Sequence, residues 1–430
     1  MKPFWLLLRR NSNYRATWMG QVVSEVGDHF NSIAVLSLTL HLTGSGLAVG
    51  AVMVSRVLPA ILAAPVAGVL LDRMDRKKIM ILSDLVRSAI ALLFIVIPIY
   101  KQTWLLYLLS GMLTFAAPFF TSGRSAILPR VATGEELHSA NALTQTTSWL
   151  TLSIGTMLGG ISIMQFGYEW AFVANSASFL FSAWAIASLR SPMGHFRPEG
   201  VTLKIAKRNA WGQDFFESLR YMRQAPLILS IALAGVGWAT GGGAAQILFT
   251  LFGEVVYKRG AGGIGLIWGF AGIGLVIGGI SGHRLGRRLG FAAYKNAVFI
   301  CFLVHGISYM LFSAMPTIWW ALVFIVLSRV AMGINSVLNK TLLLTHVPDR
   351  FRGRVFTTVD MMMNATMMIS MSVAGIATGV FPIRTIGVVA GALSTSTAVF
   401  WLWANLAGKM PEPSLEAGAE EEFEGPVVAA

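Results

Sequence analysis

Twelve long apolar segments dominate this chain of 430 residues. Each is about 20 residues long or longer, which is the length that an α-helix needs to cross the hydrocarbon core of a bilayer. The segments lack the alternation of apolar and polar residues that is typical of membrane-spanning strands. We therefore predict an all-α membrane protein with spans at 14–42, 44–70, 79–99, 104–126, 139–162, 169–189, 226–250, 263–282, 295–315, 318–343, 356–380 and 385–408.

The composition supports a protein whose main solvent is lipid. Hydrophobic residues make up 55% of the chain and charged residues only 12%, whereas a soluble domain carries about 25% charged residues. The first apolar segment contains Glu25 and Asp28 and has no small-residue cleavage site. We therefore interpret it as a retained helix and not as a signal peptide.

The formal net charge of +13 does not require a nucleic-acid partner. With an even number of spans and the N-terminus inside the cell, most Lys and Arg residues fall on cytoplasmic stretches and adjoining helix ends. Apart from the basic residues counted with those helix ends and four on outer loops, this assignment leaves Arg56 and Arg329 deep within spans. This distribution predicts a multi-pass protein of the cell inner membrane with both termini in the cytoplasm.

The longest polar interruption divides the apolar segments into two sets of six. We predict an N-terminal six-helix bundle over 1–189, a cytoplasmic linker over 190–225, a C-terminal bundle over 226–408 and a disordered acidic tail over 409–430. Within the linker, "GQDFFESLRYMRQ" places apolar residues at helical spacing and predicts a short surface helix.

The two halves carry related loops. The stretch "AGVLLDRMDRKKIM" contains Gly68, Asp72-Arg73 and Arg76-Lys77 after the second span, and "GISGHRLGRR" repeats this spacing after the eighth, with His283 in place of Asp72. The repetition indicates a parallel pseudo-repeat of six helices.

The loop Gly-x-x-x-Asp-Arg-x-x-Arg-Lys resembles the signature loop of the major facilitator superfamily. That resemblance implies two six-helix bundles that alternate access to a central site. It also implies a conformational gate in which Asp72 latches the halves, with the end of the eleventh span near Asp360 facing the loop. The gate residues are Gly68, Asp72, Arg73, Arg76, Lys77 and Asp360.

A second stretch, "GTMLGG" in the fifth span, resembles the antiporter motif of this superfamily. Gly155, Gly159 and Gly160 match it, but Thr156 replaces the proline. Small residues at this spacing also serve close helix packing, which is the alternative interpretation. Within the superfamily, the first span and "GRSAILPRVATGEELHSANAL" are similar to enterobactin exporters and macrolide-efflux proteins.

Polar stripes mark the spans that face other helices or water. The first span places Gln21, Glu25 and Asp28 on one face, the seventh contains Gln246, and the tenth contains Asn335. By resemblance, spans one, four, seven and ten line the central cavity. The stripes therefore predict the residues that bind protons or substrate.

Glu25 and Asp28 are the main candidates for proton coupling, because a carboxyl group in a low-dielectric site can load and release a proton. A fixed ion pair with Arg56, or a helix clamp, is the structural alternative. Arg56 and Arg329 could hold carboxylates of the protein or an anionic substrate.

These features predict a secondary active transporter, not an enzyme, that exports small amphipathic molecules such as drugs or siderophores by proton antiport. The proton gradient would supply the energy, so no cofactor or metal is expected, and we expect a monomer. An uptake symporter or a lysophospholipid flippase of the same fold, and a membrane-embedded sensor, remain alternatives. No Walker motif or zinc-ligand spacing occurs in the sequence.

Overall fold

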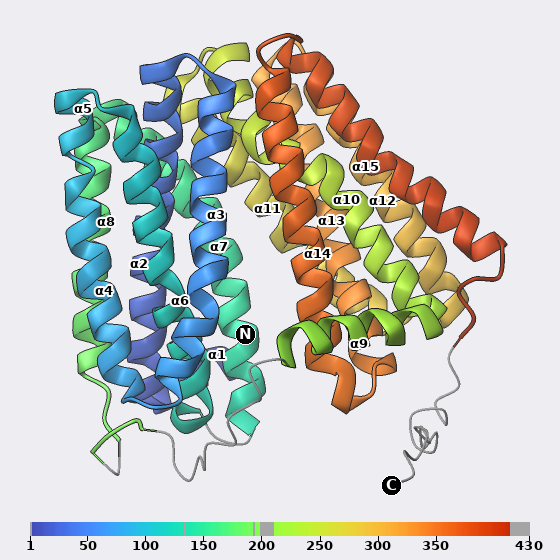
Figure 1. Ribbon diagram of the computed structural model, residues 1–430, viewed down its shortest axis with the longest axis horizontal. Helices are drawn as coiled ribbons and strands as arrows, with labels where there is room; N and C mark the ends of the chain where they lie inside the picture. The colour runs from blue at the N-terminus through green and yellow to red at the C-terminus, as the bar shows by residue number, and fades with distance from the viewer. Residues whose placement is uncertain (1, 133–134, 192–193, 198–209, 413–430) are drawn as a thin grey trace, which may run out of the picture.

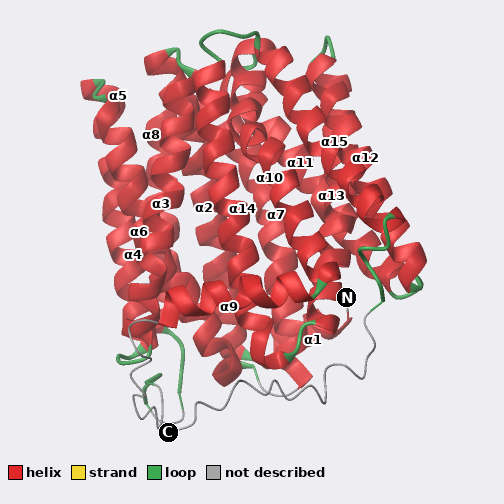
Figure 2. Ribbon diagram, turned by 45° about the vertical axis from the view of Figure 1, so that its right-hand side comes forward, coloured by secondary structure: helices red, strands yellow, loops and turns green. Residues whose placement is uncertain are grey.

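The computed structural model describes residues 2–132, 135–191, 194–197 and 210–412, and this part of the chain consists of helices and loops without strands (Figure 2). The predicted tail from residue 413 onward lies outside the described residues. Each predicted span corresponds to a long helix. These are α2 (Ser12–Thr43), α3 (Gly46–Leu71), α4 (Arg76–Leu93) continued by α5 (Val96–Tyr100), α6 (Thr103–Val131), α7 (Glu135–Phe166), α8 (Tyr168–Ala187), α10 (Pro226–Leu251) continued by the π-helical η1 (Phe252–Val256), α11 (Gly260–Gly286), α12 (Phe291–Ala314), α13 (Ile318–His346), α14 (Asp349–Ala377) and α15 (Ile383–Leu406).

Eleven of the described helices are long and apolar enough to cross a membrane. The remaining predicted span, α2, contains 32 residues but interrupts its apolar sequence with the polar stripe of Gln21, Glu25 and Asp28. This helix packs inside the first half of the molecule, against α7 and α8, so its polar face meets protein and not lipid. The protein is therefore a multi-pass membrane protein.

The long helices form two groups, α2 to α8 and α10 to α15, which lie side by side (Figure 1). The helices α1 (Lys2–Arg10) and α9 (Ala210–Gln224) lie at the same end of the molecule. We call this the linker end and the opposite one the far end.

The predicted surface helix of the linker is present as α9. Its Met222 is buried against the second group of helices, Tyr221 stacks on Phe351 with ring centroids 4.7 Å apart, and Glu217 pairs with Arg354 at 2.8 Å. Phe216 is 70% exposed. The helix therefore docks on α14 along one side and leaves an apolar side chain on the surface.

The two groups of helices share hydrophobic cores toward the far end. Leu36, Leu40 and Val49 of the first group belong to a core built mainly by the second, and Ala261 and Ile264 of α11 belong to a core built mainly by the first. In Figure 1 the ribbons of the two groups converge at the far end and diverge toward α9. The described conformation therefore closes the halves against each other at the far end.

Glycines allow this close approach. A Cβ atom added to Gly160 of α7 would lie 2.6 Å from the carbonyl oxygen of Ala261 and 3.1 Å from Cα of Gly265 in α11. On the other side of the interface, one added to Gly46 of α3 would meet the side chain of Thr378 of α14. Without side chains at these positions, the backbones can pack directly.

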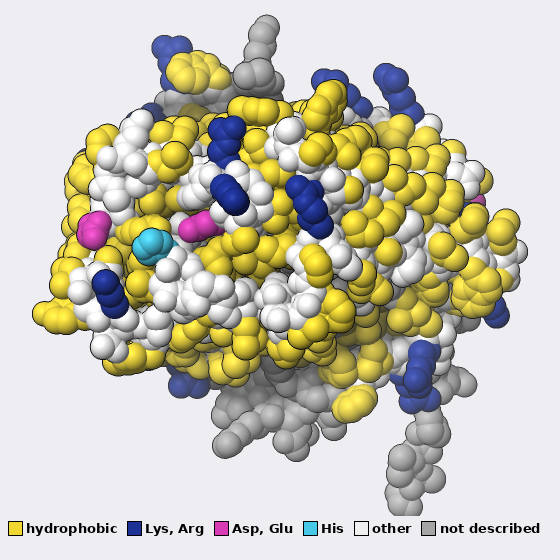
Figure 3. Space-filling view, turned by 90° about the horizontal axis from the view of Figure 1, so that it is seen from above, with side chains coloured by type: hydrophobic (Ala, Val, Ile, Leu, Met, Phe, Trp, Pro, Cys, Tyr) yellow, Lys and Arg dark blue, Asp and Glu magenta, His cyan; other side chains and the backbone are white. Residues whose placement is uncertain are grey.

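The surface at the far end carries few charges. Figure 3 shows isolated basic and acidic side chains there among hydrophobic and uncharged ones. The described loops and helix ends on this side contain the basic residues Lys101, Lys258, Arg259 and Arg384.

Candidate functional site

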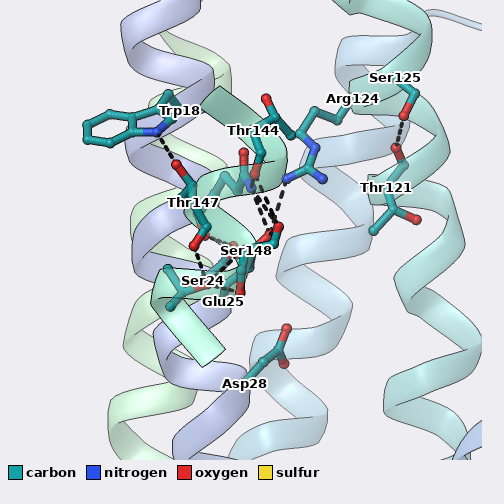
Figure 4. A network of polar contacts seen from close by, with 12 residues as sticks. Trp18, Ser24, Glu25, Asp28, Thr121, Arg124, Ser125, Thr144, Thr147 and Ser148 are labelled. Carbon is teal, nitrogen blue, oxygen red and sulfur yellow. Dashed lines mark hydrogen bonds and ion pairs between the residues drawn. The ribbon is translucent and has the colours of Figure 1, made fainter. Parts of the chain in front are cut away.

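The polar face of α2 forms a network around Glu25, near the middle of the helix (Figure 4). Oε1 of Glu25 accepts hydrogen bonds from Gln21 at 2.9 Å and from Ser148 of α7 at 3.0 Å, and Oε2 accepts one from Thr151 at 2.7 Å. Arg124 of α6 lies 3.5 Å from Oε1. One carboxylate thus joins three helices of the first half.

A second ionic cluster surrounds Asp28, one turn further along α2. Arg87 of α4 approaches Asp28 to 2.6 Å and Asp84 to 3.5 Å, and its guanidinium lies 4.0 Å from the ring centroid of Phe179 on α8. Asp84 is fully buried, whereas the side chain of Asp28 retains 32% exposure. Two carboxylates therefore share one arginine, so a neutral form of either leaves the other paired.

The arginines of these clusters were not predicted. The sequence assignment counted Arg87 and Arg124 among the basic residues of cytoplasmic stretches and helix ends, but both lie inside the helices and pair with acidic residues of α2. The predicted ion-pair partner, Arg56, instead donates a hydrogen bond to Ser32 at 2.8 Å and forms no ion pair within the described residues. The structural alternative for Glu25 and Asp28 thus involves different arginines.

The candidate residues of the second half lie apart from this network. Asn335 of α13 is buried and accepts a hydrogen bond from Asn339 at 3.0 Å. Gln246 of α10 is partly buried and makes no hydrogen bond to another described residue. Arg329 of α13 lies with its guanidinium 5.0 Å from the ring centroid of Phe249. The described contacts do not connect these three residues to Glu25 or Asp28.

Glu254 belongs to a contact between the halves that the sequence did not reveal. Its Oε2 accepts a hydrogen bond from Ser37 of α2 at 2.9 Å, and the hydroxyls of Ser37 and Tyr168 lie 3.2 Å apart. Glu254 occupies η1, where the helix widens at the far end of α10. The polar stripe of the seventh span therefore ends in a link to the first.

The basic residues of the signature loop cap helix ends of their own half. Arg76 donates to the carbonyl oxygen of Leu71, the last residue of α3, at 3.3 Å and also to that of Ala126 within α6 at 2.9 Å. Lys77 donates to the carbonyl oxygen of Leu189, just beyond α8, at 2.9 Å. Cations at helix C-termini satisfy free carbonyls and oppose the helix dipole. These residues thus hold the linker end of the first half together, whereas Arg73 is exposed.

The predicted latch between the halves is not formed in this conformation. Among the described residues, Asp72 pairs only with Arg76, at 3.9 Å, and Asp360 lies exposed three turns inside α14. A Cβ atom added to Gly68 would meet no atom within 4 Å, so this glycine serves no close helix approach here. These observations agree with halves that separate at the linker end.

The three glycines of "GTMLGG" contact different helices. A Cβ atom added to Gly155 would lie 3.0 Å from Cβ of His29, and one added to Gly159 would lie 3.1 Å from Cα of Phe30, both on α2. Gly160 instead faces α11 of the other half, and nearby Ser153 donates to the carbonyl oxygen of Gly269 at 2.9 Å. The motif packs helices within one half and between both.

The arrangement is suited to moving charge without exposing it to lipid. Glu25 and Asp28 each face an arginine, and Ser148 and Thr151 can exchange their hydrogen-bond partners as the charge on Glu25 changes. Polar groups of this kind inside a membrane mark ion or substrate pathways. Within the described residues, no group of three or more His, Cys, Asp or Glu side chains could hold a metal ion.

Comparison with known proteins places the chain in a family. A family model described as the Major Facilitator Superfamily matches residues 17–359. A Bacillus subtilis protein named as a bacilysin exporter is 25% identical over 82% of this chain and 85% of its own length. Enterobactin exporters are 26% identical in Citrobacter koseri and 28% in Salmonella typhi, over 82% of this chain and 82% and 83% of their own lengths, respectively.

Solved structures share the fold at low sequence identity. The nucleoside transporter NupG superposes with a TM-score of 0.68 at 12% identity, covering 90% of this chain and 98% of that chain. A bacterial homologue of the human lysosomal transporter Spinster gives a TM-score of 0.69 at 14% identity, covering 94% of this chain and 100% of that chain. These similarities concern the arrangement of the helices.

Proposed function

Because the chain belongs to the major facilitator superfamily and is a transporter, we propose that it exports small amphipathic molecules from the cytoplasm in exchange for protons. The observation that carries the proposal is the Glu25 network. Its carboxylate lies near the middle of α2, faces Arg124 at 3.5 Å and is held by donors from α7. Binding sites of such transporters lie near the bilayer midplane.

Proton binding to Glu25 would change the forces within the first half. A protonated carboxyl no longer attracts Arg124 as an ion, so the contact between α2 and α6 weakens and Arg124 becomes free to attract another group. Asp28 and Asp84 can respond in the same way around Arg87. Loading and releasing a proton therefore alters helix contacts at the depth where a substrate binds.

The charge distribution supports the proposed topology, and the relatives support the proposed outward direction of transport. The linker end carries α9 and the basic loop at Arg76 and Lys77, which favours a cytoplasmic location in the inner membrane. Relatives named as exporters of bacilysin and enterobactin support outward transport of a small molecule, such as a siderophore or a drug. A monomer contains both halves and is therefore sufficient for the cycle.

Inverted membrane vesicles test this proposal. Enterobactin and bacilysin are offered outside the vesicles, whose interior is made acidic, and accumulation is followed by mass spectrometry. We expect uptake that collapses with the pH gradient and that is lost in Glu25→Gln and Asp28→Asn. Glu169→Gln is the matched control, because Glu169 is an exposed acidic residue in the first turn of α8.

Other outcomes would change the assignment. Accumulation in right-side-out vesicles, driven by acid outside, would indicate an uptake symporter. Normal transport by both carboxylate variants would place the coupling group elsewhere. In every case the amount of folded variant in the membrane is measured by gel filtration in detergent.

A further inference from the structure

Arg329 differs from the other arginines in the middle of the helices. Arg87 and Arg124 each contact a carboxylate, and Arg56 donates to Ser32. Arg329 forms no ion pair or hydrogen bond with any residue that the structure describes, and its Nε atom is buried. A cation in the membrane interior is costly unless a partner compensates its charge.

Two further donors surround the same aromatic ring. Trp268 of α11 meets Phe249 edge to face with ring centroids 5.1 Å apart, and Tyr309 of α12 lies at 6.2 Å. Nε1 of Trp268 and the hydroxyl of Tyr309 are buried and, like Nε of Arg329, have no hydrogen-bond partner in the described part of the chain. Three donor groups from three helices therefore gather around one phenyl ring, each without an acceptor.

Two polar side chains from neighbouring positions, His305 and Glu254, are already engaged. His305 accepts a hydrogen bond from Trp238 through Nε2 at 3.1 Å, and its Nδ1 lies 2.8 Å from the hydroxyl of Ser328. Glu254, the acidic residue of the same helical span as Phe249, is bound to Ser37. A buried donor without an acceptor costs about 1–3 kcal/mol. The cluster is thus complementary to an acceptor that the described residues do not supply.

We propose that Arg329, Trp268 and Tyr309 bind a carboxylate group of the transported molecule, with Phe249 packing against its apolar part. A guanidinium pairs with a carboxylate through two parallel hydrogen bonds, and an indole N–H and a phenol O–H can donate to the remaining lone pairs. The proposal rests on the proposed export function and specifies its substrate class as amphipathic molecules with an acidic group.

The position of the cluster favours a carboxylate of a small molecule over a lipid headgroup. Arg329 lies near the middle of α13, about 17 Å along the helix from its first residue, whereas lipid phosphates lie at the bilayer surface. Arg329 and Trp268 are only partly buried, while Phe249 and Tyr309 are almost completely so. Parts of the Arg329 and Trp268 side chains therefore retain accessible surface, whereas Nε of Arg329, Nε1 of Trp268 and the hydroxyl of Tyr309 are buried.

A matched pair of fluorescent probes tests the site without transport. Dansyl-phenylalanine carries a carboxylate, and dansyl-phenylalaninamide has the same shape without the charge. Binding of each to the full chain in lipid nanodiscs is measured by the increase in dansyl fluorescence, with no pH gradient. We expect the carboxylate to bind at least about tenfold more tightly, which corresponds to about 1.4 kcal/mol.

Variants identify the groups responsible. Arg329→Gln should bring the two affinities together, and Arg329→Lys should retain part of the preference because it keeps the charge. Trp268→Phe keeps an aromatic ring but removes the indole N–H donor. It should therefore weaken binding of the carboxylate probe several-fold and leave binding of the amide probe unchanged. Arg284→Gln is the control, because Arg284 is an exposed residue of α11 and its variant should behave like the original chain.

Several results would overturn the site. These are equal affinities for the two probes, no saturable binding of either probe to the original chain, or a preference that survives in both Arg329→Gln and Trp268→Phe. If Arg329→Gln does not fold, as judged by gel filtration, the carboxylate preference of Trp268→Phe still tests the site. Because binding is measured without a gradient, a carboxylate preference in a chain that fails to couple transport to protons would contradict only the export mechanism.

Discussion

Replacement of Gly160 by alanine tests how the two halves close at the far end. The added Cβ atom would lie 2.6 Å from the carbonyl oxygen of Ala261 and 3.1 Å from Cα of Gly265, and both are backbone atoms that cannot rotate away. The shorter contact falls about 0.8 Å below the start of ordinary van der Waals contact at 3.4 Å, and overpacking of this kind costs about 1–3 kcal/mol.

This energy acts on the equilibrium between conformations. Because Gly160 contacts the other half, the cost applies to the conformation closed at the far end and is relieved when α7 and α11 separate. A shift of 1–3 kcal/mol changes a two-state equilibrium by about 5- to 150-fold. The Gly160→Ala variant should therefore populate a state in which the far ends of the halves lie further apart.

Electron–electron double resonance measures this change. Spin labels are attached at Lys101→Cys and Thr317→Cys, exposed positions at the far end of each half, in a chain whose buried Cys301 is replaced by alanine. Gly155→Ala is the matched control, because its Cβ would contact the side chain of His29 within the same half. An unchanged distance distribution in Gly160→Ala would refute the assignment of this glycine to closure.

Three further perturbations test individual contacts. Ser37→Ala removes the hydrogen bond to Glu254. It should therefore shift the equilibrium that these spin-label distances report toward separation, by about 1.5–3 kcal/mol. Thr39→Ala should not, because the hydroxyl of Thr39 bonds only within α2. Thermal unfolding of Glu25→Gln, Arg124→Gln and the double variant should give a coupling energy of about 0.5–3 kcal/mol between the two residues. If the changes in unfolding free energy are additive, the ion pair contributes nothing to stability. Asp72→Asn should slow transport if Asp72 holds the halves together in another conformation, and it should leave binding of dansyl-phenylalanine unchanged, because among the described residues Asp72 pairs only with Arg76 here. Normal transport rates would leave the loop with only its basic residues in a role.

The helices were predictable because an apolar run of membrane length has few alternatives to a helix. Their boundaries agree with the predicted spans to within a few residues at most ends. The largest differences are the earlier start of α14, the continuation of α10 by η1 and the later end of α6, and the break between α4 and α5 was not predicted. The polar stripe of α2 was also predictable, since residues four and three apart lie on one helix face. What faces that stripe depends on packing between helices, which the spacing does not encode.

The errors concern charges whose environment depends on the fold. Arg87 lies eleven residues after the start of α4, yet it follows a basic run and was grouped with that run. Its neighbour Asp84, at a spacing of three residues inside an apolar segment, was the available signal for an internal ion pair. For Glu25, the polar run from Thr144 to Ser148 in α7 was the corresponding signal.

The glycine motif shows a different limit. The sequence places Gly155, Gly159 and Gly160 on one helix, but only the three-dimensional arrangement shows that the first two face α2 and the third faces α11. Likewise, a lone Arg329 in an apolar span indicates a functional residue. The arrangement of Trp268 and Tyr309 around it depends on helices that are far apart in the chain.

Proton release upon substrate binding tests the central claim most directly. Detergent-solubilised protein in weakly buffered solution is mixed with enterobactin or bacilysin, and a pH indicator reports released protons, with protein-free mixing as the blank. If a proton and the substrate compete through Glu25, the original chain should acidify the solution and Glu25→Gln should release fewer protons at equal substrate occupancy. Binding without proton release, or identical release from the variant, would contradict proton antiport through this carboxylate.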